Sequence, residues 1–126
     1  MGYYRMEIRA ATRADIIELC GEPYRESIRA LVVEHEDRPI GIVGVIHREP
    51  MQCFSVVLDE LRKSPRSIVK VVKPLRVILD GYMGEIYAIA DGDVDSSSRF
   101  LEYIGFNHFQ TTSQGRIYKW PKQSPS

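Results

Sequence analysis

Three runs rich in β-branched residues follow one another in the middle of the chain, separated only by short turn-prone sequences. The runs are ALVVEHE, PIGIVGVIH and QCFSVVLDE, and the turns around them contain DRP and REP. β-Branched and aromatic residues favour strands, and short turns with proline join strands that lie side by side. The sequence therefore predicts an antiparallel meander of three strands between residues 30 and 60.

A first strand and a short helix precede the meander. Residues 7–11 have strand character, and the Thr12 hydroxyl can cap a following helix by accepting a hydrogen bond from a free backbone amide. We expect this helix to run to Leu19 and to end at Gly21, because glycine tolerates the left-handed conformation that closes many helices.

A longer helix is predicted after the meander, where apolar residues change from strand spacing to helical spacing. Ser64 is a suitable N-cap, and Pro65 suits the first helical position, where a backbone N–H has no helical partner. Pro74 lies inside the pattern, where it removes one backbone donor and predicts a kink. The apolar residues on one face of this helix are Ile68, Val71, Val72, Leu75 and Ile78.

The last third of the chain predicts a strand, a short helix and two further strands. The strand is EIYAIA, and the helix lies in VDSSSRFLEYIGF, residues 94–106. Its serines can accept hydrogen bonds from the first amides, and Gly105 suits a left-handed stop. Strands are expected near residues 107–111 and 116–120, followed by a loose tail over about residues 121–126.

Composition and charge limit the classes of function. With 126 residues, 44% of them apolar, the chain is long enough for one domain with a core, over residues 1–126. Its 17 basic and 17 acidic residues balance, which argues against binding nucleic acid or an anionic membrane through net charge. The sequence has neither an apolar run of spanning length nor a signal-peptide core, so we expect a soluble cytoplasmic protein.

The cysteines and histidines do not predict a chemical centre. Cys20 and Cys53 lack CxxC spacing, so we expect buried or half-buried thiols and no disulfide. His35, His47 and His108 are dispersed, without the short spacing of metal ligands, so no metal site is expected. The sequence also lacks the GxSxG, Walker and GxGxxG motifs.

The order of these elements resembles the GNAT superfamily of acyl-CoA-dependent N-acetyltransferases. The hairpin sequence ALVVEHEDRPIGIVGVI is similar to the family's second and third strands, and VDSSSRFLEYIGF resembles the segment often written as Asn, several residues, then YEKxGF. The resemblance implies an α+β fold with a mixed, mostly antiparallel sheet of about seven strands, flanked by three or four helices. In that family the parallel fourth and fifth strands splay apart, and acyl-CoA inserts its pantetheine between them.

This resemblance implies an acetyl-CoA site in two parts. On the fourth strand, the backbone of Val56, Val57 and Leu58 would contact the pantetheine. At the start of the next helix, the family has a six-residue phosphate-binding pattern: Arg or Gln, any two residues, Gly, any residue, and then Gly or Ala. Here the pattern falls on residues 62–67, and Pro65 stands at the position of the first glycine. Because proline has no amide to donate, the loop departs from the family pattern. The residues there that are expected to contact the cofactor are Arg62, Lys63, Ser64, Arg66 and Ser67.

A basic stretch covers the same helix. No acidic residue interrupts it, and it predicts an anion site for the cofactor's phosphates, a contact for an acidic partner, or a solvated helix face. A nucleic-acid partner is not favoured, because there is no binding motif and no interleaved aromatic residue. The basic residues are Arg62, Lys63, Arg66, Lys70, Lys73 and Arg76.

The residues for acid–base catalysis are not evident in the sequence. In many family members the acid is a tyrosine four residues before the glycine, and here that position is Leu101. Tyr103 lies about 200° further around the helix, so we expect it to pack or to line a rim. No spacing rule selects a base, so the catalytic residues stay unassigned. The candidates, each of which could equally be a solvent-facing residue, are Glu34, His47, Asp59 and Glu60.

Two functions from different classes fit these observations. In the first, the chain transfers an acetyl group from acetyl-CoA to an amine acceptor. In the second, it is a catalytically inactive GNAT-fold protein that binds a protein partner, such as a phage virion or assembly component. The second follows from RFLEYIG, Arg99–Gly105, which resembles small phage-encoded GNAT-like proteins, and it would place the chain in the host cytoplasm or the virion.

Overall fold

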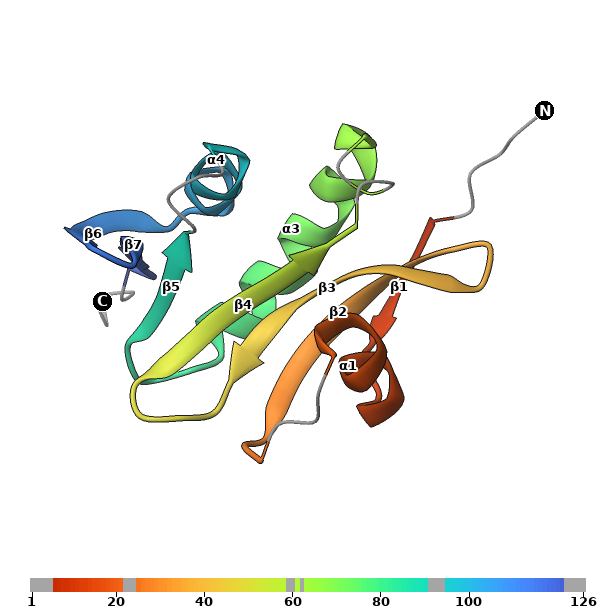
Figure 1. Ribbon diagram of the computed structural model, residues 1–126, viewed down its shortest axis with the longest axis horizontal. Helices are drawn as coiled ribbons and strands as arrows, with labels where there is room; N and C mark the ends of the chain where they lie inside the picture. Colours follow the sequence, from red (N-terminus) through yellow and green to blue (C-terminus); the bar gives the residue numbers. More distant parts are fainter. Residues whose placement is uncertain (1–5, 22–24, 59–60, 62, 91–94, 122–126) are drawn as a thin grey trace.

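The structure is a computed structural model that describes residues 6–21, 25–58, 61, 63–90 and 95–121. Strands and helices follow one another in the order that the sequence predicts (Figure 1). The strands are β1 (Met6–Ala10), β2 (Ile28–His35), β3 (Arg38–Ile46), β4 (Met51–Val57), β5 (Ile86–Ala90), β6 (Asn107–Thr112) and β7 (Gly115–Lys119). The helices are α1 (Arg13–Cys20), α3 (Pro65–Asp80) and α4 (Asp95–Ile104). The predicted tail beyond Pro121 lies outside the described residues.

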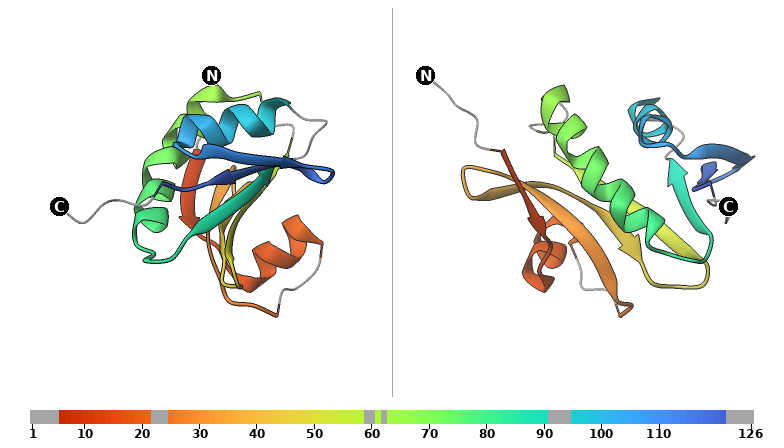
Figure 2. Two further views of the ribbon diagram at one scale, coloured as in Figure 1. Left: turned by 90° about the vertical axis from the view of Figure 1, so that its left-hand side faces the viewer. Right: turned by 180° about the vertical axis from the view of Figure 1, so that it is seen from behind.

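The strands form one seven-stranded sheet in the order β1-β2-β3-β4-β5-β7-β6. Every neighbouring pair is antiparallel except β4 and β5, which are parallel. Helix α1 lies against one face of the sheet, and α3 and α4 lie against the other (Figure 2). The expected α+β fold with a mixed, mostly antiparallel sheet is therefore confirmed.

The alternation of side chains along the strands divides the core between the two faces. Under α3 and α4 lies the larger buried cluster, which includes Leu75 and Ile104. A smaller cluster on the α1 face contains Val32 and Ile42. All the apolar residues predicted on one face of α3 belong to the larger cluster or pack against it, so that face determines how α3 lies on the sheet.

A capping box and an ion pair hold α1 in place. The Asp15 amide donates to the Thr12 hydroxyl at 3.3 Å, and the Thr12 amide donates to the Asp15 carboxylate at 2.7 Å. Arg9 of β1 donates hydrogen bonds from both terminal nitrogens to the same carboxylate, at 2.6 and 2.8 Å. Its side chain also contacts Glu34 of β2. Gly21 ends the helix at φ 85°, as predicted. Arg9 thus joins α1 to β1 and to the neighbouring strand β2.

Helix α3 differs from the sequence prediction at its start. Ser64 occupies the N-cap position, but its side chain makes no capping hydrogen bond, because its hydroxyl lies 2.7 Å from that of Ser67. The helix continues through Pro74 to Asp80, so this proline does not end it. No helix in the described part of the chain is long and apolar enough to cross a membrane.

Helix α4 ends where the sequence predicts, and a residue of α3 completes its end. Gly105 has φ 127°, and the Phe106 amide donates to the Leu101 carbonyl at 2.9 Å. Arg76 of α3 donates from Nε to the Ile104 carbonyl at 2.6 Å and from Nη2 to the Tyr103 carbonyl at 3.2 Å. Since these are among the last carbonyls of α4, Arg76 satisfies groups that have no partner within the helix.

The first prediction concerns Asp15, which is only 5% exposed. The hydrogen bonds from Arg9, with those from Thr12, hold its pKa well below the usual range. A carboxyl with a lowered folded-state pKa stabilises the fold above its unfolded pKa of about 3.9, and this contribution is lost as the pH falls below that value. We expect Asp15→Asn to lower the free energy of unfolding by about 2 kcal/mol near neutral pH. Urea unfolding at neutral and acidic pH measures this.

Glu18→Gln on the exposed side of α1 is the matched control and should change little. The mutant with Asn at position 15 should also lose less stability on acidification than the parent chain, because the titrating group has been removed. Equal losses in the two proteins would contradict the role of Asp15.

The second prediction concerns the contact between α3 and α4. Arg76→Met keeps the aliphatic stem of the side chain and removes its donors, so the free energy of unfolding should fall by about 1–2 kcal/mol. Lys73→Met, at an exposed position of the same helix, is the control. Chemical denaturation of both variants measures the difference in their free energies of unfolding. Equal values for Arg76→Met and Lys73→Met would show that the Arg76 contact does not stabilise the fold.

Candidate functional site

The parallel strands β4 and β5 are paired only near their starts. The pairs are Met51 with Ile86, Gln52 with Tyr87, and Cys53 with Ala88. Beyond them the strands diverge, and Figure 1 shows the two arrows starting close together and pointing apart. The second half of β4 therefore has one edge that is paired with β3 and one edge that no strand in the described part of the chain covers.

Backbone geometry shows which residues present that uncovered edge. The Leu58 amide donates to the Ile40 carbonyl of β3 at 3.0 Å. Because the backbone groups of successive residues in a strand point to opposite edges, Val56 and Leu58 are directed toward β3. Ser55 and Val57 are consequently directed toward β5, where the pairing has already ended. Of these two residues, only Val57 was among the predicted contacts.

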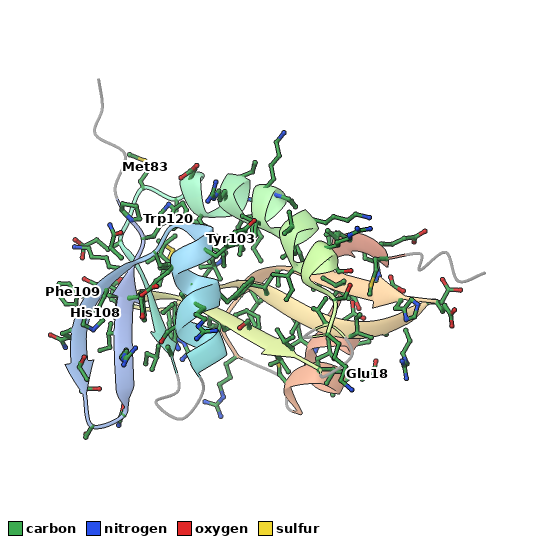
Figure 3. All side chains as sticks on the ribbon, turned by 90° about the horizontal axis from the view of Figure 1, so that it is seen from above. Glu18, Met83, Tyr103, His108, Phe109 and Trp120 are labelled. Carbon is green, nitrogen blue, oxygen red and sulfur yellow. The ribbon has the colours of Figure 1, made fainter. Side chains whose placement is uncertain are left out.

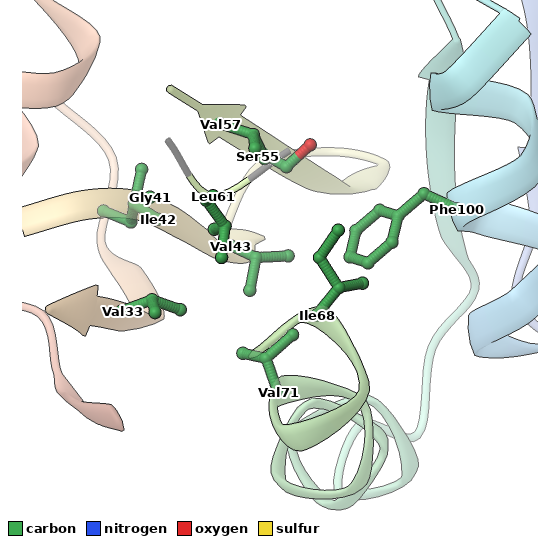
Figure 4. Close-up of a pocket in the computed structure, with 10 residues that line it drawn as sticks. All are labelled: Val33, Gly41, Ile42, Val43, Ser55, Val57, Leu61, Ile68, Val71 and Phe100. Atoms are coloured by element: carbon green, nitrogen blue, oxygen red, sulfur yellow. The ribbon is translucent and has the colours of Figure 1, made fainter. Parts of the chain in front are cut away.

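An apolar cavity of about 200 Å³ lies beside this edge, between the sheet and the two helices. Figure 4 shows Phe100 of α4 and Ile68 of α3 on one side of it and the strands on the other. Ser55 supplies the polar side chain among the described lining residues. The other described lining residues are Val33, Gly41, Ile42, Val43, Val57, Leu61, Ile68, Val71 and Phe100.

The start of α3 offers few free backbone donors. The Ser64 amide donates to the Leu61 carbonyl at 2.9 Å, and the Ser67 amide donates to the Ser64 carbonyl at 3.1 Å. The two serine hydroxyls contact each other, and Pro65 has no N–H. Ser67 is also buried. Anion binding here would therefore depend on side chains more than on a backbone cradle.

The basic stretch has two kinds of members. Lys63, Arg66, Lys70 and Lys73 are exposed, and the last three follow at helical spacing along α3. Arg76, by contrast, bonds to the end of α4, so its guanidinium is used within the fold. Arg62 lies outside the described residues. The exposed cations nearest the start of α3 are thus Lys63 and Arg66.

Helix α4 presents hydrocarbon to the cavity. Leu101, which the sequence resemblance aligns with the family's acid, is 7% exposed and belongs to the core. Phe100, the residue before it, lines the cavity instead. Tyr103 is 54% exposed and does not line it. Neither Phe100 nor Leu101 can donate a proton.

The predicted base candidates do not gather at the cavity. Glu34 is paired with Arg9. His47 follows the end of β3, next to the start of β4 and therefore away from the splayed ends, and its ring contacts the Tyr82 hydroxyl. Asp59 and Glu60 lie outside the described residues.

Cys53 lies in the last β4–β5 pair, but its thiol is unreactive. Burial raises the pKa of its thiol to about 12, so it stays protonated at neutral pH and is no nucleophile. Cys20, at the end of α1, is half-buried. Within the described ranges, no group of His, Cys, Asp and Glu side chains could hold a metal ion.

A parallel pair of strands that splays apart inside an otherwise antiparallel sheet, with a helix following the fourth strand, is the fold of the GNAT acyltransferase superfamily. Comparison with solved structures shows the same fold at low sequence identity. PaiA, an N-acetyltransferase from Thermoplasma acidophilum in complex with coenzyme A, matches with a TM-score of 0.66 and 12% identity, over 91% of this chain and 98% of that one.

Two further structures are similar over comparable lengths. A mutant of the spermidine N-acetyltransferase SpeG from Vibrio cholerae has a TM-score of 0.64 and 15% identity, over 91% of each chain. An acetyltransferase of the GNAT family from Staphylococcus aureus has a TM-score of 0.66 and 13% identity, over 91% of this chain and 98% of that one. No protein-family model and no curated protein sequence matches this chain.

The site fits one part of an acyl-CoA better than the other. The uncovered edge at Ser55 and Val57 can exchange hydrogen bonds with the amides of a pantetheine arm, and the apolar cavity suits an acyl group. The diphosphate would meet no glycine-rich cradle, because Pro65 and the engaged amides of Ser64 and Ser67 replace it. Exposed lysine and arginine side chains are the groups present for phosphate.

Proposed function

We propose that this chain binds an acyl-CoA between β4 and β5 and transfers the acyl group to an amine. The observation that carries this proposal is the early end of the β4–β5 pairing, which leaves a strand edge beside an apolar cavity. The splay leaves backbone donors and acceptors of β4 without strand partners, so a ligand with complementary groups can bind them. The structural similarity to a coenzyme A complex supports the choice of cofactor.

The cofactor would be held by different groups along its length. The backbone of Ser55 and Val57 would bind the pantetheine amides, while Val56 and Leu58 keep β4 attached to β3. At the start of α3, Lys63 and Arg66 would bind the phosphates, joined by Arg62, which the sequence places in the family's cationic position. Ser64 and Ser67 would shape this turn through their mutual hydrogen bond.

The second substrate would approach from the opposite face of the sheet. A groove of about 380 Å³ lies there, lined by Gln52, Tyr87, Ile89 and Phe109 among others. Figure 3 shows Phe109 on β6, well away from Glu18 of α1, so α1 leaves this part of the face uncovered. SpeG is a spermidine N-acetyltransferase, which supports an amine as the acceptor class.

The chain would act by positioning the reactants and excluding water. When bound, the cofactor supplies a thioester whose carbon–sulfur bond is exchanged for a carbon–nitrogen bond to the amine, and the amine's proton passes to the released thiol. No described side chain that lines the cavity ionises near neutral pH. Orientation along the β4 edge and removal of water by the apolar walls are therefore the contributions of these residues.

Titration calorimetry with acetyl-CoA tests the proposal. We expect binding, and we expect Arg66→Ala to weaken it about fivefold, because one charge-assisted hydrogen bond to phosphate at an exposed site contributes about 1 kcal/mol. The effect should shrink at high salt. Lys73→Ala, about two turns further along α3, is the matched control and should bind like the parent chain.

Two results would contradict different parts of this proposal. Absence of both heat and thermal stabilisation at millimolar CoA thioester would overturn the function, because a ligand that binds the folded state must stabilise it. Normal binding by the Arg66→Ala variant would leave the function in place and overturn the phosphate site.

A further inference from the structure

The cavity beside β4 extends further than an acetyl group would need. Its walls include Ser55 and Val57 at the uncovered edge, but also Val43 of β3 and Val33 of β2, which are buried and lie one and two strands away from β4. The space therefore runs from the splay of β4 and β5 across β3 to β2, among residues of the larger core cluster.

The size and chemistry of this space suit a hydrocarbon chain. Its volume is about 200 Å³. A dry cavity of about 150 Å³ lined by Leu, Ile and Phe is enough to bind benzene, so the space here has room for about six carbon atoms. Apart from Ser55 at its mouth, its described walls are valine, leucine, isoleucine, phenylalanine and glycine, which cannot satisfy a polar ligand.

A glycine on β3 keeps the space open. A Cβ added at Gly41 would lie 2.5 Å from Cδ2 of Leu61, which packs over β3 at this point. Any larger residue would therefore push the end of the Leu61 side chain away from the strand, and both residues line the cavity. The absence of a side chain at position 41 thus lets Leu61 lie close to β3, and the cavity keeps its shape only while Leu61 stays in that place.

We propose that this cavity is an acyl-chain pocket, and that the preferred substrate is a CoA thioester of a linear acyl chain of about six carbons and not of acetate. The inference rests on the proposed function, because the pocket opens at the β4 edge that would hold the pantetheine. The chain would enter past Phe100 and Ile68, with its thioester near Ser55 and its methyl end near Val33.

Calorimetry with coenzyme A, acetyl-CoA and hexanoyl-CoA on the full chain tests the pocket. Each buried methylene strengthens binding about fourfold, so the four additional carbons of hexanoyl-CoA should raise affinity at least about tenfold over acetyl-CoA. Equal affinities for the two thioesters would overturn the acyl-chain pocket and leave the proposed function intact.

Gly41→Ala gives a test within the chain itself. By displacing the Leu61 side chain it should reduce the preference for hexanoyl-CoA over acetyl-CoA at least about threefold, with little change for acetyl-CoA. Gly81→Ala, at the exposed end of α3, is the matched control and should keep the parent preference. A Gly41→Ala variant that is folded and retains the full preference would contradict the pocket.

A binding experiment without coenzyme A separates the two proposals and needs no variant to fold. Titration of the parent chain with 1-hexanol should shift the methyl NMR signals of Val33, Val43, Leu61 and Ile68, and ethanol at the same concentration should not. Such shifts without binding of any CoA thioester would support the pocket's chain selectivity and overturn the proposed function. Unshifted methyl signals at saturating 1-hexanol would overturn the pocket.

Discussion

The short pairing of β4 with β5 is the constraint on which the rest of the structure depends. Three residue pairs join these strands, and then both continue in different directions. This arrangement joins two parts, β1 to β4 and β5 to β7, into one continuous sheet. The C-terminal ends of β4 and β5 are left unpaired with each other. Helices α3 and α4 follow one strand each and cover the same face, so the cavity lies where the two parts separate.

Because β4 and β5 do not pair beyond their starts, other contacts must hold α3 and α4 in place beside the cavity. The apolar face of α3 anchors it to the sheet, and Arg76 joins it to the last carbonyls of α4. Gly105 then turns the chain directly into β6. Because glycine has no Cβ, it leaves room for Trp120, whose ring would lie 3.2 Å from a Cβ at this position. These contacts stabilise the end of α4 that is remote from its cavity-lining residue, Phe100.

Local signals in the sequence predicted the elements well, and contacts between distant residues explain what they missed. Thr12, Gly21 and Gly105 act within a few residues of themselves, so their patterns could be interpreted without the fold. The pairing of Glu34 with Arg9 depends on strand register, which no local spacing reveals. Ser55 could have been recognised from its alternation with Cys53 and Val57, but only if the end of the β4–β5 pairing had been known. A role in virion assembly stays a prediction from sequence resemblance.

The sequence by itself determined the order of strands and helices, the cap at Thr12 and the helix ends at Gly21 and Gly105. These follow from chemistry within a few residues along the chain. Only the tertiary structure decided that Ser55 and Val57 present the free edge of β4, that Arg76 bonds to α4, and that an apolar space reaches from the splay to β2. The physical reason is that each of these features depends on how segments distant in sequence lie against one another. Packing over the whole sheet determines those positions.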